Sequence, residues 1–308
     1  MTRNVQPWPR VGLADLDPLE APIPRPTRNP RALVGTSPLD LPLPPTYRCH
    51  RTAEAPGVDG RIDDPVWRSA EWSPPFVAIE DGRQVALDSR LALLWDDDFL
   101  YAAYRFVDPQ PTAICDQAHD WVFLWDPDAE LFLHGDGGYL EIGVNPIGTL
   151  YQIAWTWLES VLERSDYGRL DELLTTTEFV YLTARPGERM GRFGDQEIEV
   201  DGLRWATHVG ELPDVAGPPG RGWSVEYAIP WSGLGFMAGD LRLPPLAGDV
   251  LRMQAYRAHH DIVDPDLVLR WQQRWGPDVT PFNGWTWAPQ GSTDVHNPEA
   301  WVPVEFTD

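Results

Sequence analysis

The sequence predicts an all-β fold, an antiparallel β-sandwich of the immunoglobulin or jelly-roll type. Three stretches alternate apolar and polar residues with the period of a strand that has one buried face: Arg90–Leu94, Tyr139–Val144 and the first part of Gly222–Gly235. The first runs into an acidic turn, the second into an Asn-Pro pair, and the third into Pro230, which lacks the N–H that a central strand donates. Three strands that end in the same way indicate one sandwich.

The remaining elements are shorter or less regular. Arg90–Val107 has the residue types of a hairpin around an acidic turn. Val58–Ile62 predicts a strand with a turn at Asp59-Gly60, and the aspartates ahead of Pro65 predict a capped helical turn that carries Trp67 into the core. Four further stretches predict strands that complete the sandwich: Leu203–Val209, Val250–Tyr256, Leu267–Trp271 and Trp301–Phe306.

Proline content divides the chain into an arm and one domain. Residues 1–46 hold a dense share of the 32 prolines, which block helix and central strand, so an extended or disordered arm is predicted there. Residues 47–308 form the sandwich domain, with an insertion at about 155–200 in which Trp155–Glu163 and Leu170–Leu174 have helical spacing. Pro109–Gly138 lacks a clear period, which predicts a long surface connection.

The composition limits the classes of partner. The 308 residues carry 47 acidic and 24 basic side chains, a formal charge of −23. Such a charge repels nucleic-acid phosphates and anionic membrane surfaces, so neither partner is expected. It is compatible with a neutral ligand such as a sugar, with bound cations, or with a role in solubility alone. The sequence does not indicate an oligomeric state.

Targeting signals and cysteines bear, less strongly, on the compartment of the protein and on its disulfide and zinc chemistry. The N-terminus lacks the apolar core of a secretory signal, and no stretch has the ~18 apolar residues of a membrane span, which favours a cytoplasmic protein. A secreted protein is the alternative if the sequence is a mature fragment. The two cysteines, Cys49 and Cys115, are too few for a disulfide framework or a thiolate zinc site.

Six phrases in order resemble carbohydrate-binding module family 9 and its stand-alone relatives. They are GRIDDPVW, LLWDDDFLYAAYRFVDP, GYLEIGVNPIGT, GWSVEYAIPWSGLG, GDVLRMQAYR and WTWAPQG, spread over most of 47–306. The resemblance implies a β-sandwich and non-catalytic binding of a saccharide, by stacking on tryptophan rings and hydrogen bonding to polar side chains. Many relatives are secreted proteins that act on polysaccharides.

The resemblance also implies site residues. Trp125, with Trp121 as its substitute, and Trp287 match the two tryptophans that sandwich a sugar, while Glu130 and Asn145 match the acid and the amide that bind it. A position that is charged in the family is Gly143 here.

Structural roles are the alternatives for these residues. Most of the 16 tryptophans are expected to fill the core. Asn145 precedes a proline and could only shape a turn, and Glu130 could face solvent or pair with Arg252 or Arg257. The family also binds structural calcium, for which Asp108, Asp126 and Asp128 are the candidate ligands, although acidic clusters are more often solvated turns.

An enzyme is the alternative function. The inserted segments predict a pocket at the mouth of the sandwich, where an enzyme could act on a glycoside or another small polar substrate. The sequence assigns no catalytic residue, but it offers these acid–base groups: His119, Asp120, His134, Asp136, His259, His260 and His296.

Overall fold

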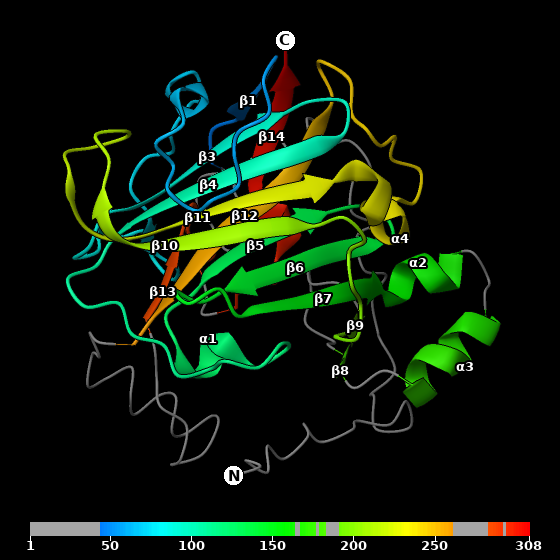
Figure 1. Cartoon of the computed structure of the whole chain (residues 1–308). Coiled ribbons are helices and arrows are strands. Elements are labelled where there is room, and N and C mark those ends of the chain that lie inside the picture. The colour runs from blue at the N-terminus through cyan, green and yellow to red at the C-terminus, as the bar shows by residue number, and fades with distance from the viewer. Residues whose placement is uncertain (1–43, 164–166, 177–178, 183–190, 261–282, 292–293) are drawn as a thin grey trace.

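The computed structural model describes residues 44–163, 167–176, 179–182, 191–260, 283–291 and 294–308. The strands of these residues form one 14-stranded mixed sheet that curls so that its two halves face each other (Figure 1). This confirms the predicted all-β sandwich. No helix in the described part of the chain has both the length and the apolar character needed to span a membrane.

The strands of each half are neighbours in the sheet. The first half contains β10 (Arg204–Leu212), β11 (Gly220–Pro230), β4 (Phe99–Val107), β3 (Ser89–Trp95) and β1 (Tyr47–Arg51). The second half contains β14 (Val302–Thr307), β12 (Val250–His259), β5 (Ala129–His134), β6 (Gly138–Val144), β7 (Leu150–Trp157), β9 (Gly191–Asp195) and β8 (Phe179–Leu182). β13 (Asn283–Thr286) pairs with β12, and β2 (Val77–Ala78) pairs with β13.

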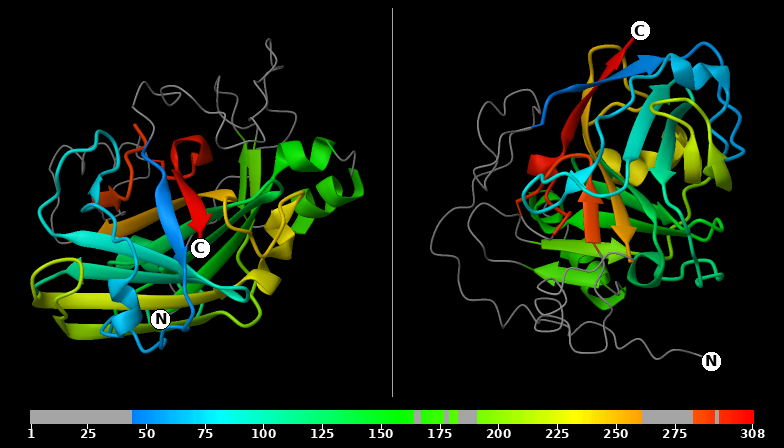
Figure 2. Two further views of the ribbon diagram at one scale, coloured as in Figure 1. Left: turned by 90° about the horizontal axis from the view of Figure 1, so that it is seen from above. Right: turned by 90° about the vertical axis from the view of Figure 1, so that its left-hand side faces the viewer.

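Helical elements are short and lie outside the sheet. They are η3 (Pro65–Arg68), α1 (Val122–Trp125), α2 (Leu158–Glu163), α3 (Tyr167–Thr176), η4 (Trp231–Leu234), α4 (Gly235–Ala238) and η5 (Pro298–Ala300). Both views of Figure 2 place α2 and α3 beside each other at the edge of the sheet. The pairing is antiparallel throughout the described strands except at β1, which runs parallel to both β14 and β3.

The main core lies between the two halves. Alternate side chains of β3, β4 and β11 meet those of β5, β6 and β12, so each of these strands gives one face to the core. Two buried tyrosines of the first half also bond to the second, since Tyr104 donates its hydroxyl to the Glu130 carbonyl (2.7 Å) and Tyr227 donates to that of Ala129 (2.9 Å). These contacts fix the distance between the halves.

Most of the predicted strands are confirmed. β3, β4, β6, β11 and β12 lie where alternation predicts them, and β10 and β14 contain most of Leu203–Val209 and Trp301–Phe306. The capped turn is confirmed as η3, where the Asp64 carboxylate accepts from the Val66 N–H and Trp67 is buried. The predicted strand Leu267–Trp271 and nearly all of the N-terminal arm lie outside the described residues.

Three local predictions were wrong. Val58–Ile62 has the turn predicted at Asp59-Gly60, with a φ of 84° at Gly60, but it is not a strand, because the Gly60 N–H bonds to the Glu226 side chain instead of a neighbouring strand. The first helix of the insertion begins at Leu158, since Trp155 is still in β7 and packs into an aromatic cluster. The stretch Pro109–Gly138 is not wholly irregular, because it contains α1 and the buried strand β5.

Candidate functional site

A cluster of aromatic side chains covers the outer face of the second half. β5 turns Leu131 and Leu133 into the main core, so Phe132 and Glu130 project from the opposite face. There, Phe132 joins rings from β6 and β7, with Tyr139 stacked on Trp155 at a centroid distance of 5.6 Å. We call this set the outer aromatic cluster.

Three buried carboxyl groups lie within this face and are connected through one tyrosine. Tyr151 donates its hydroxyl to Glu141 Oε1 (3.2 Å), and Trp155 donates its indole N–H to Glu141 Oε2 (2.6 Å). The Tyr151 hydroxyl is also in hydrogen-bonding contact with Glu130, whose carboxyl contacts that of Asp128. Asp128 in turn accepts from the Ala258 N–H (2.9 Å). We call Asp128, Glu130 and Glu141 the carboxyl chain.

Burial dominates the proton affinity of the carboxyl chain. All three residues have an exposed fraction of 4% or less, and desolvation disfavours the charged form of an acid. Burial raises the pKa of Asp128 and of Glu141 to about 7, and it raises the pKa of Glu130 further, helped by the charge of Asp128. Burial therefore favours the protonated form of Glu130, and in Glu141 it outweighs the hydrogen bonds from Trp155 and Tyr151, which favour the anion.

Charged groups on adjacent elements complete this environment. The Arg192 guanidinium lies 5.1 Å from the centre of the Trp155 ring and lowers the pKa of Glu141, although burial outweighs it. His296 Nδ1 lies 2.8 Å from the Tyr139 hydroxyl and 3.9 Å from Glu141 Oε2. Burial, and then the charge of Arg192, lower the pKa of His296 to about 3, so this imidazole is neutral.

A small pocket opens beside the carboxyl chain. It is partly open to solvent and is lined by Trp121, Phe123 and Tyr151 together with His119, Asp120 and Gln152. Neighbouring rings are close, at 5.4 Å for Trp121–Phe123 and 5.7 Å for Phe123–Tyr151. Tyr151 therefore belongs to both features, since its ring lines the pocket and its hydroxyl contacts Glu130 and Glu141. We call this the Trp121 pocket.

The polar residues of the Trp121 pocket retain groups for a ligand. Gln152 is 6% exposed, and its Oε1 accepts from the Val200 N–H (3.0 Å), which leaves its amide N–H donors. Asp120 Oδ2 accepts from the Gln117 N–H (3.0 Å), which leaves the other oxygen. His119 lies in a turn with φ of 63° and has a buried Nδ1 without a hydrogen-bond partner. These are the groups that bind sugar hydroxyls in general.

The predicted amide Asn145 holds the loop that carries this pocket. Its side chain donates to the Cys115 carbonyl and to Asp126 Oδ2, both at 2.8 Å, and its oxygen accepts from the Thr149 N–H (2.9 Å). Asp126 also accepts from the backbone N–H groups of Ile114 and Cys115. Asn145 thus has the turn-shaping role that the sequence left open, and it positions α1 from below.

The structure separates the predicted tryptophans. Trp121 precedes α1 as its N-cap residue and lines the pocket, whereas Trp125 is the last residue of α1 and packs, partly exposed, against the outer aromatic cluster. Trp287 is 8% exposed and lies in the main core, with its ring edge-on to Tyr47 at 5.0 Å. Trp287 is not among the described residues that line the Trp121 pocket. Glu130 is buried in the carboxyl chain and pairs with neither Arg252 nor Arg257.

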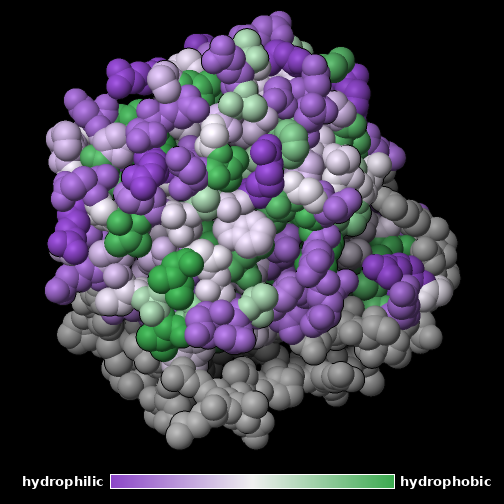
Figure 3. All heavy atoms as spheres, viewed as in Figure 1, coloured by the Kyte–Doolittle hydropathy of each residue, from purple (hydrophilic) through white to green (hydrophobic). Residues whose placement is uncertain are grey.

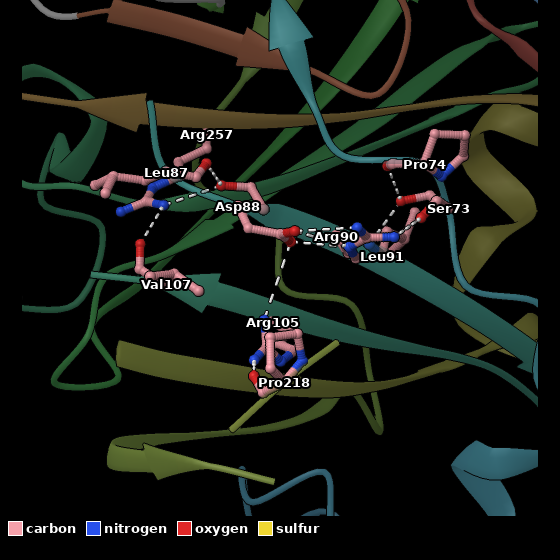
Figure 4. Close-up of polar contacts among 11 residues, drawn as sticks. Ser73, Pro74, Leu87, Asp88, Arg90, Leu91, Arg105, Val107, Pro218 and Arg257 are labelled. Atoms are coloured by element: carbon pink, nitrogen blue, oxygen red, sulfur yellow. Dashed lines mark hydrogen bonds and ion pairs between the residues drawn. The ribbon is translucent and has the colours of Figure 1, made fainter. Parts of the chain in front are cut away.

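The aspartates predicted as calcium ligands have protein partners. Asp108 Oδ2 accepts from Arg257 Nη2 (2.7 Å), and Arg257 also bonds to Ser89 and the Val107 carbonyl, the latter drawn in Figure 4. Asp126 and Asp128 bond to backbone N–H groups as described above. Within the described ranges, no three or more His, Cys, Asp or Glu side chains are grouped so that they could hold a metal ion.

Sequence reasoning did not single out Tyr151 or Glu141. A signal for Glu141 was present, because it is the one charged residue in the strand YLEIGV. A charge within an otherwise apolar strand is expected to have specific partners if both faces of the strand are buried. No comparable signal marked Tyr151, whose role depends on the residues opposite it in the sheet.

The fold and the side chains described above define a β-sandwich protein with an aromatic outer face that contains buried acids. No protein-family model matches the chain, and no curated protein matches it. Among solved structures, the chain is similar to a putative carbohydrate-binding protein from Bacteroides uniformis ATCC 8492, with a TM-score of 0.52 and 14% identity. That match covers 85% of this chain and 99% of the other, and it confirms at the level of the fold the resemblance expected from the sequence.

Two further solved structures are similar to the chain. Both are of a carbohydrate-binding module family 9 from Caldicellulosiruptor kristjanssonii, one in complex with cellotriose and one with glucose. Each has a TM-score of 0.46 and 15% identity and covers 85% of this chain. The match includes 94% of the cellotriose-bound chain and 96% of the glucose-bound chain.

Proposed function

We propose that the protein binds a saccharide, without catalysis, in the Trp121 pocket. The observation that carries this proposal is the row of three rings, Trp121, Phe123 and Tyr151, beside the polar groups of Asp120 and Gln152. A sugar ring offers C–H groups to an aromatic face and hydroxyls to amides and carboxylates.

Calorimetry with a panel of sugars tests the proposal. Neutral, amino and acidic mono- and disaccharides are titrated into the whole chain, and at least one is expected to bind. Trp121→Ala is expected to weaken that binding by about tenfold or more, because a central aromatic side chain carries much of the affinity of a small site. The absence of binding to a folded wild-type protein by the whole panel would contradict the proposal.

Phe236→Ala is the matched control for Trp121→Ala. Phe236 lies in α4 with an exposed fraction of 38%, and it does not line the Trp121 pocket. Its replacement removes an aromatic ring from the surface and is expected to leave the affinity unchanged. If both variants lose affinity equally, the tryptophan has no specific role.

A glycoside-cleaving enzyme is the second candidate, because the carboxyl chain brings together acids with raised pKa values. Such acids near a pocket are frequent in catalytic sites. Among the described residues, the contact between these acids and the Trp121 pocket is made by the Tyr151 hydroxyl. Incubation with aryl glycosides and released-sugar analysis test this candidate: turnover that Glu130→Gln abolishes would support it, and binding without turnover would support the non-catalytic function.

A further inference from the structure

The described lining of the Trp121 pocket is acidic. None of the described residues that line the pocket is lysine or arginine, whereas Asp120 is part of the lining. Glu199 lies on the adjacent segment, with its carboxylate 3.9 Å from Nε2 of the lining residue His119. The carboxyl chain contacts the Tyr151 hydroxyl, but burial raises the pKa values of its acids, so it adds little negative charge below pH 7. The negative charge that a ligand would meet in the pocket is therefore that of Asp120.

The three rings of the pocket provide a second attraction for a cation. The face of an aromatic ring is electronegative, and an ammonium or guanidinium group within ~6 Å of a ring centre is attracted to it. Trp121, Phe123 and Tyr151 are close enough together for one bound group to contact at least two of them. A neutral sugar also stacks on such rings, but it gains nothing from the surrounding charge.

The same face already binds a cation of the protein itself. The Arg192 guanidinium lies over the Trp155 ring at 5.1 Å, with Asp294 at 3.9 Å and the Glu141 charge nearby. The chain thus uses an indole face and carboxylates together to hold positive charge within one side of the sheet. The formal charge of −23 further raises the local concentration of cationic ligands around the molecule.

We propose that the Trp121 pocket prefers saccharides that carry a protonated amine over neutral saccharides of the same shape. This inference rests on the proposed function, because it names the class of saccharide that the same site selects. Asp120 would be the specificity-determining residue, since it is the one carboxylate among the described lining residues and has an oxygen left for the ligand.

Three disaccharides with the same β-1,4-linked backbone distinguish the effect of charge on affinity from the effect of stacking on the rings. They are chitobiose, which carries two amines, cellobiose, which carries hydroxyls at those positions, and diacetylchitobiose, in which the amines are neutralised as amides. Calorimetry with the whole chain, at a pH about one unit below the pKa of the amines, is expected to show chitobiose binding about fivefold more tightly than either neutral sugar. High salt is expected to remove most of this difference.

Two variants test whether the preference for chitobiose arises in the Trp121 pocket. Asp120→Asn keeps the acceptor for the Gln117 N–H and is expected to weaken chitobiose more than cellobiose, so that the ratio of the two affinities falls. Asp116→Asn removes the same charge in the same loop, from a residue that bonds to the Gln117 side chain and is not among the described lining residues. This control is expected to leave the ratio unchanged.

The possible outcomes distinguish this inference from the proposed function. Equal or tighter binding of the neutral disaccharides would overturn the preference for amines and leave saccharide binding intact. A preference for chitobiose that Asp120→Asn and Asp116→Asn reduce equally would assign it to the overall charge and overturn the role of the pocket. If none of the three binds and no other sugar does, the proposed function itself fails.

Discussion

At the scale of single residues, Glu226 shows how a buried charge can fold a loop onto the sheet. It projects from β11 on the outer face of the first half with an exposed fraction of 1%. Its carboxylate accepts from the Asp59 N–H (3.0 Å), the Gly60 N–H (2.8 Å) and the Trp67 indole (2.7 Å). Three donors compensate the desolvation of this carboxylate, so it holds the segment before η3 in place of strand pairing.

Glu226→Gln is expected to destabilise the fold by roughly 2–4 kcal/mol, since an amide brings N–H donors against the donors already present and leaves one of them unpaired. Urea unfolding followed by tryptophan fluorescence measures the change. Glu211→Gln, an exposed substitution on the neighbouring strand β10, is the control and is expected to change stability by less than about 0.5 kcal/mol. Equal midpoints for the two variants would contradict the role given to Glu226.

At the scale of elements, glycines in neighbouring strands make room for the rings of the site. Gly143 in β6 is opposite Tyr151 in β7, and a Cβ at Gly143 would lie 2.3 Å from the Tyr151 ring. Gly194 in β9 is in the same situation, with the Trp155 ring 2.8 Å from the Cβ position. Gly143 matches a position that is charged in the family that the sequence resembles. In this chain a glycine is needed there because the Tyr151 ring occupies the space of a side chain.

Gly143→Ala is expected to displace the Tyr151 ring, because an added methyl group has no space there. We expect a loss of about 1–3 kcal/mol in stability and weaker saccharide binding, since the ring lines the Trp121 pocket and its hydroxyl contacts the carboxyl chain. Thermal unfolding and calorimetry measure the two effects. Gly220→Ala in β11, where nothing lies within 4 Å of the added carbon, is the matched control and is expected to affect neither.

At the scale of the whole molecule, buried ionisable groups make stability depend on pH in two opposing ways. Hydrophilic residues cover much of the described surface on the face drawn in Figure 3, and charges in contact with water have little individual effect on stability. Asp128 and Glu141, with pKa values of about 7, stabilise the fold fully below pH ~4, and this stabilisation is lost as the pH rises through 7. His259 and His296, lowered by burial to about 3, contribute stability above pH ~6.5 that is lost as the pH falls.

Glu141→Gln isolates the contribution of one carboxyl group. Between about pH 5 and pH 8, the wild type is expected to lose roughly 1–3 kcal/mol relative to this variant, because the folded wild type must release a proton that its unfolded chain has already released. Urea unfolding at several pH values measures the difference. Parallel pH profiles for wild type, Glu141→Gln and the exposed control Glu211→Gln would contradict it.

The parts of the fold that follow local rules could be predicted from the sequence. The hairpin of β3 and β4, the strands β6 and β11 and the aspartate cap of η3 depend on periodicity and on residues a few positions apart. The strand predicted at Val58–Ile62 was wrong because its partners are in β11, more than 160 positions away, with the Gly60 N–H bonded to Glu226. No local pattern encodes such a contact.

The sequence by itself determined that the chain is an all-β sandwich, that Asn145 has a turn-forming context, and that Trp121 and Glu130 are candidate site residues. Only the tertiary structure decided that Trp287 faces the core and that Tyr151 joins the pocket to Glu141. The physical reason is that a strand alternates its side chains between two faces, and a one-residue change of register exchanges them. Which face meets the core, and which residues meet on the other, depends on how the whole sheet pairs and curls.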